Sequence, residues 1–94
     1  MLIEPRERFV FVPLLYELMS GELKGWEVAP DYASLLQGRG ISHLQDSVSS
    51  IDLDARSVTT SSGQTLEYSQ LVLATGAQPE DFGIPGVREN ALNF

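Results

Sequence analysis

Residues 71–79 read Leu-Val-Leu-Ala-Thr-Gly-Ala-Gln-Pro, and this stretch decides the class of fold. Its four apolar residues follow one another without polar alternation, which is typical of a strand buried on both faces of a parallel sheet. The small residues after them let a backbone approach a flat ligand closely. A parallel strand needs a parallel neighbour, and the only other candidate is the short apolar stretch at residues 1–3. We therefore expect an α/β fold whose sheet is incomplete.

Upstream of this strand the chain consists of short runs rich in β-branched residues. The runs at 48–53, 57–60 and 65–68 are separated by Asp-Ala-Arg at 54–56 and by Ser-Ser-Gly-Gln at 61–64. Residues of this kind are typical of turns between strands. The pattern predicts an antiparallel β-meander of about three strands.

Two short helices are expected nearer the N-terminus. The first begins at Pro13, whose missing N–H costs nothing in the first turn, and ends at Gly21 as a C-terminal cap. The second begins near Pro30-Asp31 and stops at Gly38 or Gly40. Each carries apolar residues at helical spacing: Leu14, Leu15, Leu18 and Met19 in the first, and Tyr32, Leu35 and Leu36 in the second. The tail after Pro79 is rich in glycine and proline and is expected to be a loop.

Composition limits the size and the chemistry of the molecule. A chain of 94 residues, 43% of them hydrophobic, buries one modest core and accommodates at most a single domain. Thirteen acidic against six basic residues give a formal charge of −7, which argues against nucleic acid as a partner. No cysteine is present, so the chain forms no disulfide, thiolate metal site or dithiol pair. No apolar run approaches the roughly 20 residues that cross a bilayer, and we expect no transmembrane segment.

Glu4 is a candidate binding residue. It directly follows the apolar residues 1–3, and a strand that ends in an acid is where a dinucleotide-binding fold places a carboxylate against ribose hydroxyls. The alternative for this residue, taken alone, is a solvated surface acid. His43, the only histidine, has no second ligand candidate near it in sequence and is interpreted as a packing residue.

The order of motifs along the chain resembles the FAD-binding domain of type II NADH:quinone dehydrogenases, within the FAD-dependent pyridine nucleotide-disulfide oxidoreductase superfamily. The resemblance rests on Leu-Ile-Glu-Pro-Arg-Glu-Arg-Phe-Val-Phe-Val-Pro-Leu-Leu-Tyr-Glu-Leu at residues 2–18, Ser-Gly-Glu-Leu at 20–23, the meander, and the stretch at 71–79. It runs nearly end to end. It implies that residues 1–94 are part of an FAD/NAD(P)-binding Rossmann-like domain, without the N-terminal glycine-rich strand-turn-helix and without the NADH-binding domain.

The resemblance also implies a set of FAD-binding residues. Glu4 corresponds to the acid that binds the adenosine ribose, and Val48 corresponds to a residue that meets the adenine through its backbone. Ala74, Thr75 and Gly76 correspond to the turn that lies against the cofactor. The segment beginning at Pro13 resembles the part that passes near the flavin ring. The resemblance implies no catalytic side chain and no metal ligand in these residues.

The function implied by the resemblance is electron transfer from NAD(P)H through flavin to a quinone. In this reaction the cofactor makes and breaks bonds while the protein orients it. The absence of cysteine argues against a dithiol mechanism, because relatives that reduce disulfides or sulfide place thiols near the flavin. We expect residues 1–94 to be inactive alone, to bind FAD weakly or not at all, and to come from a protein that is cytoplasmic or peripheral to the inner face of a membrane.

Two other hypotheses remain open. One is a module without catalysis that binds a partner or forms a homo-oligomer through unpaired strand edges. The other keeps the flavoprotein ancestry and changes the electron acceptor, as in ferredoxin-reductase-like enzymes. The sequence does not decide between NADH and NADPH as the electron donor.

Overall fold

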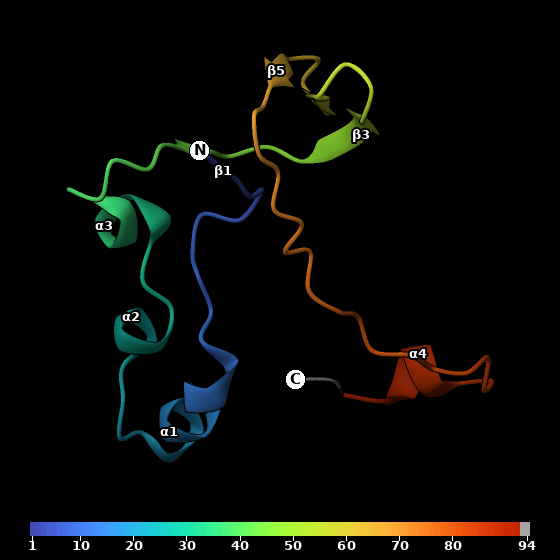
Figure 1. The fold of residues 1–94 in the computed structure, drawn as a ribbon. Coiled ribbons are helices and arrows are strands. Elements are labelled where there is room, and N and C mark those ends of the chain that lie inside the picture. Colours follow the sequence, from blue (N-terminus) through green and yellow to red (C-terminus); the bar gives the residue numbers. More distant parts are fainter. Residues whose placement is uncertain (93–94) are drawn as a thin grey trace.

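The chain folds as a mixed α/β structure, which confirms the expected class. The structure is a computed structural model that describes residues 1–92, so residues 93–94 of the predicted domain lie outside it. Its elements, in order, are β1 (Leu2–Ile3), the 3-10 helix η1 (Val12–Leu14), α1 (Leu15–Ser20), α2 (Gly25–Val28), α3 (Tyr32–Leu36), β2 (His43–Leu44), β3 (Val48–Asp52), β4 (Ser57–Thr60), β5 (Thr65–Glu67) and α4 (Val87–Asn90). Figure 1 shows the meander at one end of the molecule and η1, α1 and α2 at the other.

The predicted meander forms as an antiparallel sheet in the order β3-β4-β5. Ile51 pairs with Val58, which pairs in turn with Leu66. Along β4 the buried and half-buried residues alternate, with Val58 and Thr60 on the covered side. This is the period of two that a sheet with one covered face requires.

The parallel part of the sheet differs from the expectation. Strand β1 pairs in parallel with β2, in the register Leu2 to His43 and Ile3 to Leu44, which sequence reasoning missed. The stretch at 71–74 was expected to be a buried parallel strand, but it is extended chain outside any strand and is exposed throughout. A parallel strand exists only beside a neighbour, and within residues 1–92 the β1–β2 pair does not extend to this stretch and no other residue pairs with it.

Both predicted helices are present. Pro13 lies in the first turn of η1, and α1 ends at Gly21, whose left-handed backbone (φ 81°) lets its N–H reach the last carbonyls of the helix. Helix α3 begins after Asp31, whose carboxylate accepts a hydrogen bond from the backbone N of Ser34 at 2.7 Å. Sequence reasoning missed the short helices α2 and α4, the latter in the tail expected to be a loop.

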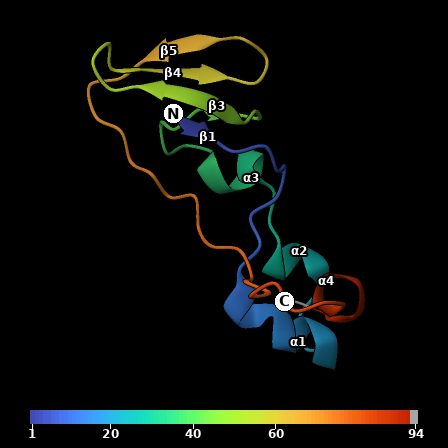
Figure 2. The same cartoon turned by 90° about the vertical axis from the view of Figure 1, so that its right-hand side faces the viewer.

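The apolar core is small and divided. Among residues 1–92, the buried hydrophobic residues are Val28 and Tyr32 in the helical part and Val58 in the meander. The radius of gyration is 17.0 Å, whereas a compact domain of this size has about 13 Å. Figures 1 and 2 show the two parts joined by thin connections and an extended trace from β5 to α4. Within the described residues, no helix is long and apolar enough to cross a membrane.

Candidate functional site

Glu4 lies directly after β1, and its backbone is held on both sides. Its N–H donates to the carbonyl of Leu44 at 3.1 Å, which extends the parallel pairing by one residue. Its own carbonyl accepts a hydrogen bond from Nε2 of His43 at 2.9 Å. Because a carbonyl only accepts, Nε2 carries the proton in this arrangement. The position of Glu4 is therefore fixed by the second strand of the parallel pair.

The carboxylate of Glu4 is fixed as well, by Arg6. Its Oε1 accepts from the backbone N of Arg6 at 3.0 Å and from Nε at 2.8 Å, and its Oε2 accepts from Nη2 at 3.2 Å. The Glu4 side chain is 18% exposed and that of Arg6 is 68% exposed. Hydrogen bonds from Arg6 stabilise the charged form and lower the pKa of Glu4. The site thus presents an ionised, oriented carboxylate at its edge.

His43 supports this arrangement from the side of the helices. Its ring lies 4.9 Å from the ring of Tyr32, which in turn has the ring of Phe9 at 6.2 Å. The interpretation of His43 as a packing residue is thus correct but incomplete, because the histidine also donates to Glu4. This hydrogen bond arises because residues 2–3 pair with residues 43–44. Strands of two residues carry no local sequence pattern from which that pairing could be predicted.

Val48 begins β3 at an irregular place in the sheet. The register shifts between Val48 and Ser50, and Ser49 Oγ donates across to the carbonyl of Thr59 at 3.0 Å. A shift of this kind is a β-bulge, which re-aims side chains and is common beside functional sites. The side chain of Val48 is partly open to solvent.

A hydrogen-bonded lock holds the start of β3. Asp46 accepts from Ser47 N at 2.7 Å through one oxygen, and through the other from Ser62 Oγ at 2.5 Å and Ser62 N at 3.3 Å. The buried Thr60 shares a hydrogen bond of 3.1 Å with Ser62 and accepts from Gln64 N at 3.2 Å. The bond from Ser62, followed by those from Thr60 and Ser47, lowers the pKa of Asp46 to about 2. Sequence analysis did not single out Asp46.

The structure brings Glu4 and Val48 to the same side of the molecule. Gln45, which follows β2, donates from Nε2 to the carbonyl of Pro5 at 3.3 Å, so the chain turns toward β3 right beside Glu4. Figures 1 and 2 show β1 in the half of the molecule that carries the meander. Residues 74–76 are exposed in the extended trace, with Gly76 at φ 71°, and no hydrogen bond described for residues 1–92 joins them to Glu4 or Val48.

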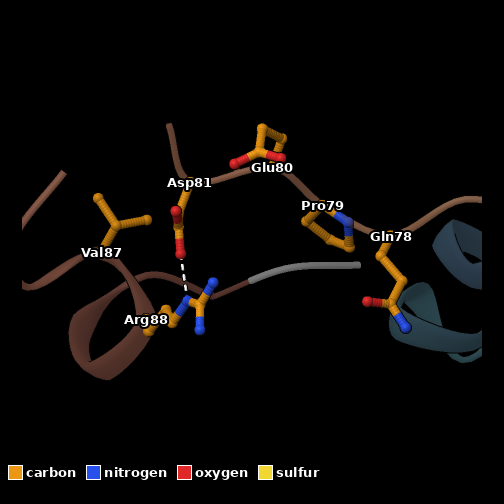
Figure 3. A pocket seen from close by; sticks show the side chains of 6 residues that line it. All are labelled: Gln78, Pro79, Glu80, Asp81, Val87 and Arg88. Carbon is orange, nitrogen blue, oxygen red and sulfur yellow. Dashed lines mark hydrogen bonds and ion pairs between the residues drawn. The ribbon is translucent and has the colours of Figure 1, made fainter. Parts of the chain in front are cut away.

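A separate hollow lies in the tail, away from these residues. Figure 3 shows it between the segment Gln78–Asp81 and the start of α4, with Arg88 pointing at Asp81. Asp81 pairs with Nε of Arg88 and accepts from Gly83 N at 2.8 Å. The ion pair joins the two walls of this hollow, between the segment before α4 and α4 itself. Within residues 1–92, no three His, Asp or Glu side chains gather as a metal site would require.

Comparison with known proteins gives a consistent picture. The whole chain, residues 1–94, matches the model of the family described as "Pyridine nucleotide-disulphide oxidoreductase". It is 41% identical to the alternative NAD(P)H-ubiquinone oxidoreductase C1, chloroplastic/mitochondrial, of Arabidopsis thaliana, with 99% of the chain and 20% of the relative covered. It is 36% identical to the demethylphylloquinone reductase of Synechocystis sp., with 99% and 24% covered.

A solved structure agrees with the fold. The chain is similar to the sulfide:quinone oxidoreductase of Aquifex aeolicus, with a TM-score of 0.61 and 36% identity over 71% of this chain and 16% of that one. The chain therefore spans roughly a fifth of the length of the curated relatives it matches.

Proposed function

The chain belongs to the pyridine nucleotide-disulphide oxidoreductase family, and on that premise we propose that it forms part of the FAD-binding domain of an NAD(P)H:quinone oxidoreductase. The observation that carries this proposal is the Glu4 carboxylate, oriented and ionised at the end of a parallel strand. A carboxylate in this place accepts hydrogen bonds from the ribose hydroxyls of a bound dinucleotide. The names of relatives that act on NAD(P)H or on a quinone support the same assignment.

Family membership implies a flavin cofactor, and FAD is the form we propose. Glu4 contacts the adenosine ribose and Val48 contacts the adenine through its backbone. Ala74, Thr75 and Gly76 lie against the cofactor once the stretch 71–74 is covered by neighbouring strands. Helix η1, which contains Pro13, lies far from β1, which precedes Glu4 (Figure 1), and this separation fits an elongated ligand whose two ends lie apart.

The role of these residues is to bind and orient, because the flavin supplies the hydride and electron chemistry when it is bound. Glu4 stays charged because Arg6 donates to it, and Asp46 fixes the strand that carries Val48. The chain contains no cysteine, so a reaction that needs a thiol, as in sulfide oxidation, finds none here. The name of the Arabidopsis thaliana relative supports NAD(P)H as the electron donor.

The proposal is tested first on the gene and then on its product. We expect the reading frame to continue upstream into a Gly-x-Gly-x-x-Gly segment and downstream into a second one, since both dinucleotides need such a loop. The complete product is expected to carry one FAD and to oxidise NADH or NADPH with a soluble quinone. A complete product that binds no flavin contradicts the proposal. Activity with sulfide but not with NAD(P)H contradicts the proposed electron donor.

Self-association is the second candidate, favoured by exposed apolar residues such as Trp26 (64%) and Val72 (85%). Sedimentation of the 94-residue chain at several concentrations tests it. A mass that rises with concentration supports a homo-oligomer, and a constant monomer mass contradicts it.

A further inference from the structure

The acceptor capacity of Glu4 is nearly used up within the protein. A carboxylate offers about four lone-pair positions on its two oxygens. Arg6 occupies both on Oε1, through its backbone N at 3.0 Å and Nε at 2.8 Å, and one on Oε2, through Nη2 at 3.2 Å. One position on Oε2 is left for a ligand. A ribose, however, presents two neighbouring hydroxyl groups.

Arg6 retains the complementary capacity. A guanidinium carries five N–H donors, and two of those of Arg6 are directed at Glu4, one from Nε and one from Nη2. The three others lie on a side chain that is 68% exposed, next to the less exposed carboxylate. The bidentate pairing holds the guanidinium plane in line with the carboxylate. Donors and one free acceptor therefore lie side by side on the same edge.

We propose that Glu4 and Arg6 together recognise a vicinal diol, with Glu4 accepting from one hydroxyl and Arg6 donating to the oxygen of the other. This deepens the proposed function, on which it rests, because it makes Arg6 a specificity-determining residue for the adenosine ribose. A hydroxyl group donates and accepts, so a diol satisfies both groups without breaking the ion pair. A carboxylate alone, accepting from both hydroxyls, has to give up bonds to Arg6 first.

The pair is held ready by its surroundings. The backbone N–H of Glu4 is bonded to Leu44, and its carbonyl is bonded to His43. Backbone and side chain are thus both fixed before a ligand arrives, which reduces the ordering cost of binding. Within residues 1–92 the Arg6 side chain hydrogen-bonds to Glu4 alone, so replacing Glu4 also releases Arg6.

The test uses the 15N-labelled 94-residue chain and three nucleosides: adenosine, 2′-deoxyadenosine and 3′-deoxyadenosine. At millimolar concentration, adenosine is expected to shift the backbone signals of residues 4–6 and the Nε–H signal of Arg6. Each deoxy analogue lacks one hydroxyl and is expected to bind about tenfold more weakly. The same titrations are made with Arg6→Lys, which keeps the charge and loses the planar fork. Arg39→Lys, which changes an exposed arginine bonded to the carbonyl of Leu35, is the matched control.

The decisive result is a difference between the two analogues. Arg6→Lys is expected to lower the affinity for adenosine and for one deoxy analogue about tenfold. The affinity for the other analogue, which already lacks the oxygen that Arg6 contacts, is expected to stay unchanged. An equal loss for all three nucleosides overturns the inference. The inference is also overturned if AMP binds tightly in a way that depends on Arg6 while the binding of adenosine does not depend on it, because Arg6 then binds the phosphate. No response to any nucleoside also overturns it, whereas the proposed function is judged separately by quinone reduction in the complete product.

Discussion

Truncating Val28 to alanine is expected to unfold the helical part of the chain and leave the meander intact. Val28 is completely buried in α2, and its carbonyl accepts from Phe11 N at 3.0 Å. Removing two methyl groups costs about 1.6 kcal/mol of transfer free energy. A cavity of roughly 40–50 Å³ adds about 1 kcal/mol at ~24 cal/mol per Å³. The sum of about 2–3 kcal/mol is a large share of what so small a core supplies.

Amide hydrogen exchange measures the effect in each part separately. The amides of Phe9, Phe11 and Tyr32 report on the helical part, because they donate to Pro30, Val28 and Glu7 at 2.9–3.0 Å. Their protection is expected to fall by roughly 30-fold to 150-fold, or to disappear where it was smaller. The amides of β4 are expected to keep their protection.

Two further variants serve as controls for this experiment. Trp26→Ala changes a large residue of the same helix that is 64% exposed, and it is expected to alter stability by less than about 0.5 kcal/mol. Val58→Ala truncates the buried valine of β4 and is expected to have the opposite pattern, with loss of protection in the meander alone. If Val28→Ala and Val58→Ala each lower protection equally in both parts, the chain is one cooperative unit and the reasoning from two separate cores is wrong.

Three other local features are tested by single substitutions. Gly21→Ala places a side chain on a residue with left-handed backbone (φ 81°), and it is expected to lower the free energy of unfolding, measured by thermal unfolding, by about 1 kcal/mol. Gly25→Ala is the control, because a Cβ added there meets nothing within 4 Å, and it is expected to leave the stability unchanged. Asp46 has its pKa lowered to about 2 in the fold from an ordinary 3.8, so its stabilising effect is present above pH ~4 and lost as the pH falls toward ~2. Asp46→Asn is expected to remove that acid dependence from exchange in the meander, and an unchanged acid profile contradicts the lock. His43→Phe keeps a ring against Tyr32 and removes the hydrogen-bond donor to the carbonyl of Glu4. The hydrogen-exchange rate of the Glu4 amide is therefore expected to rise about fivefold, while exchange in α3 is unaffected. A loss of exchange protection in α3 contradicts this role of His43.

The parts of the fold that the sequence predicted are those with a local cause. Pro13 and Gly21 limit the first helix by their own backbone chemistry, and Asp31 caps the second with its side chain. The meander follows from β-branched runs separated by turn residues. In each case the residues that decide the element lie within it or next to it.

The parts that the sequence did not predict depend on pairing over long distances. Strand β2 has two residues, and its existence depends on β1, which lies about forty positions earlier in the chain. The Asp46 lock joins residues sixteen positions apart. The expectation of a strand at 71–74 came from apolar content alone, and a parallel strand exists only with a neighbour. For the candidate site, the sequence indicated Glu4 but not Arg6 or Asp46. The roles of these two residues depend on which hydrogen bonds the carboxylates accept, and only the three-dimensional structure shows those bonds.

The exposed apolar residues could be covered by a second copy of the chain or by a surrounding domain, and their location distinguishes these two possibilities. One group is the run Leu71–Leu73, where Val72 and Leu73 are 85% and 67% exposed, beside the meander. The other lies on the helical part, with Met19 at 67% and Trp26 at 64%. Figures 1 and 2 show the trace that follows β5 leaving the meander, whereas α1 and α2, which contain Met19 and Trp26, lie at the other end of the molecule. A two-fold pair of copies that meets through one strand edge covers the first group and leaves the second in water. A surrounding domain covers both, and it supplies the parallel neighbour that the run at 71–74 lacks. The apolar surface is therefore better explained by burial inside a larger flavoprotein than by self-association.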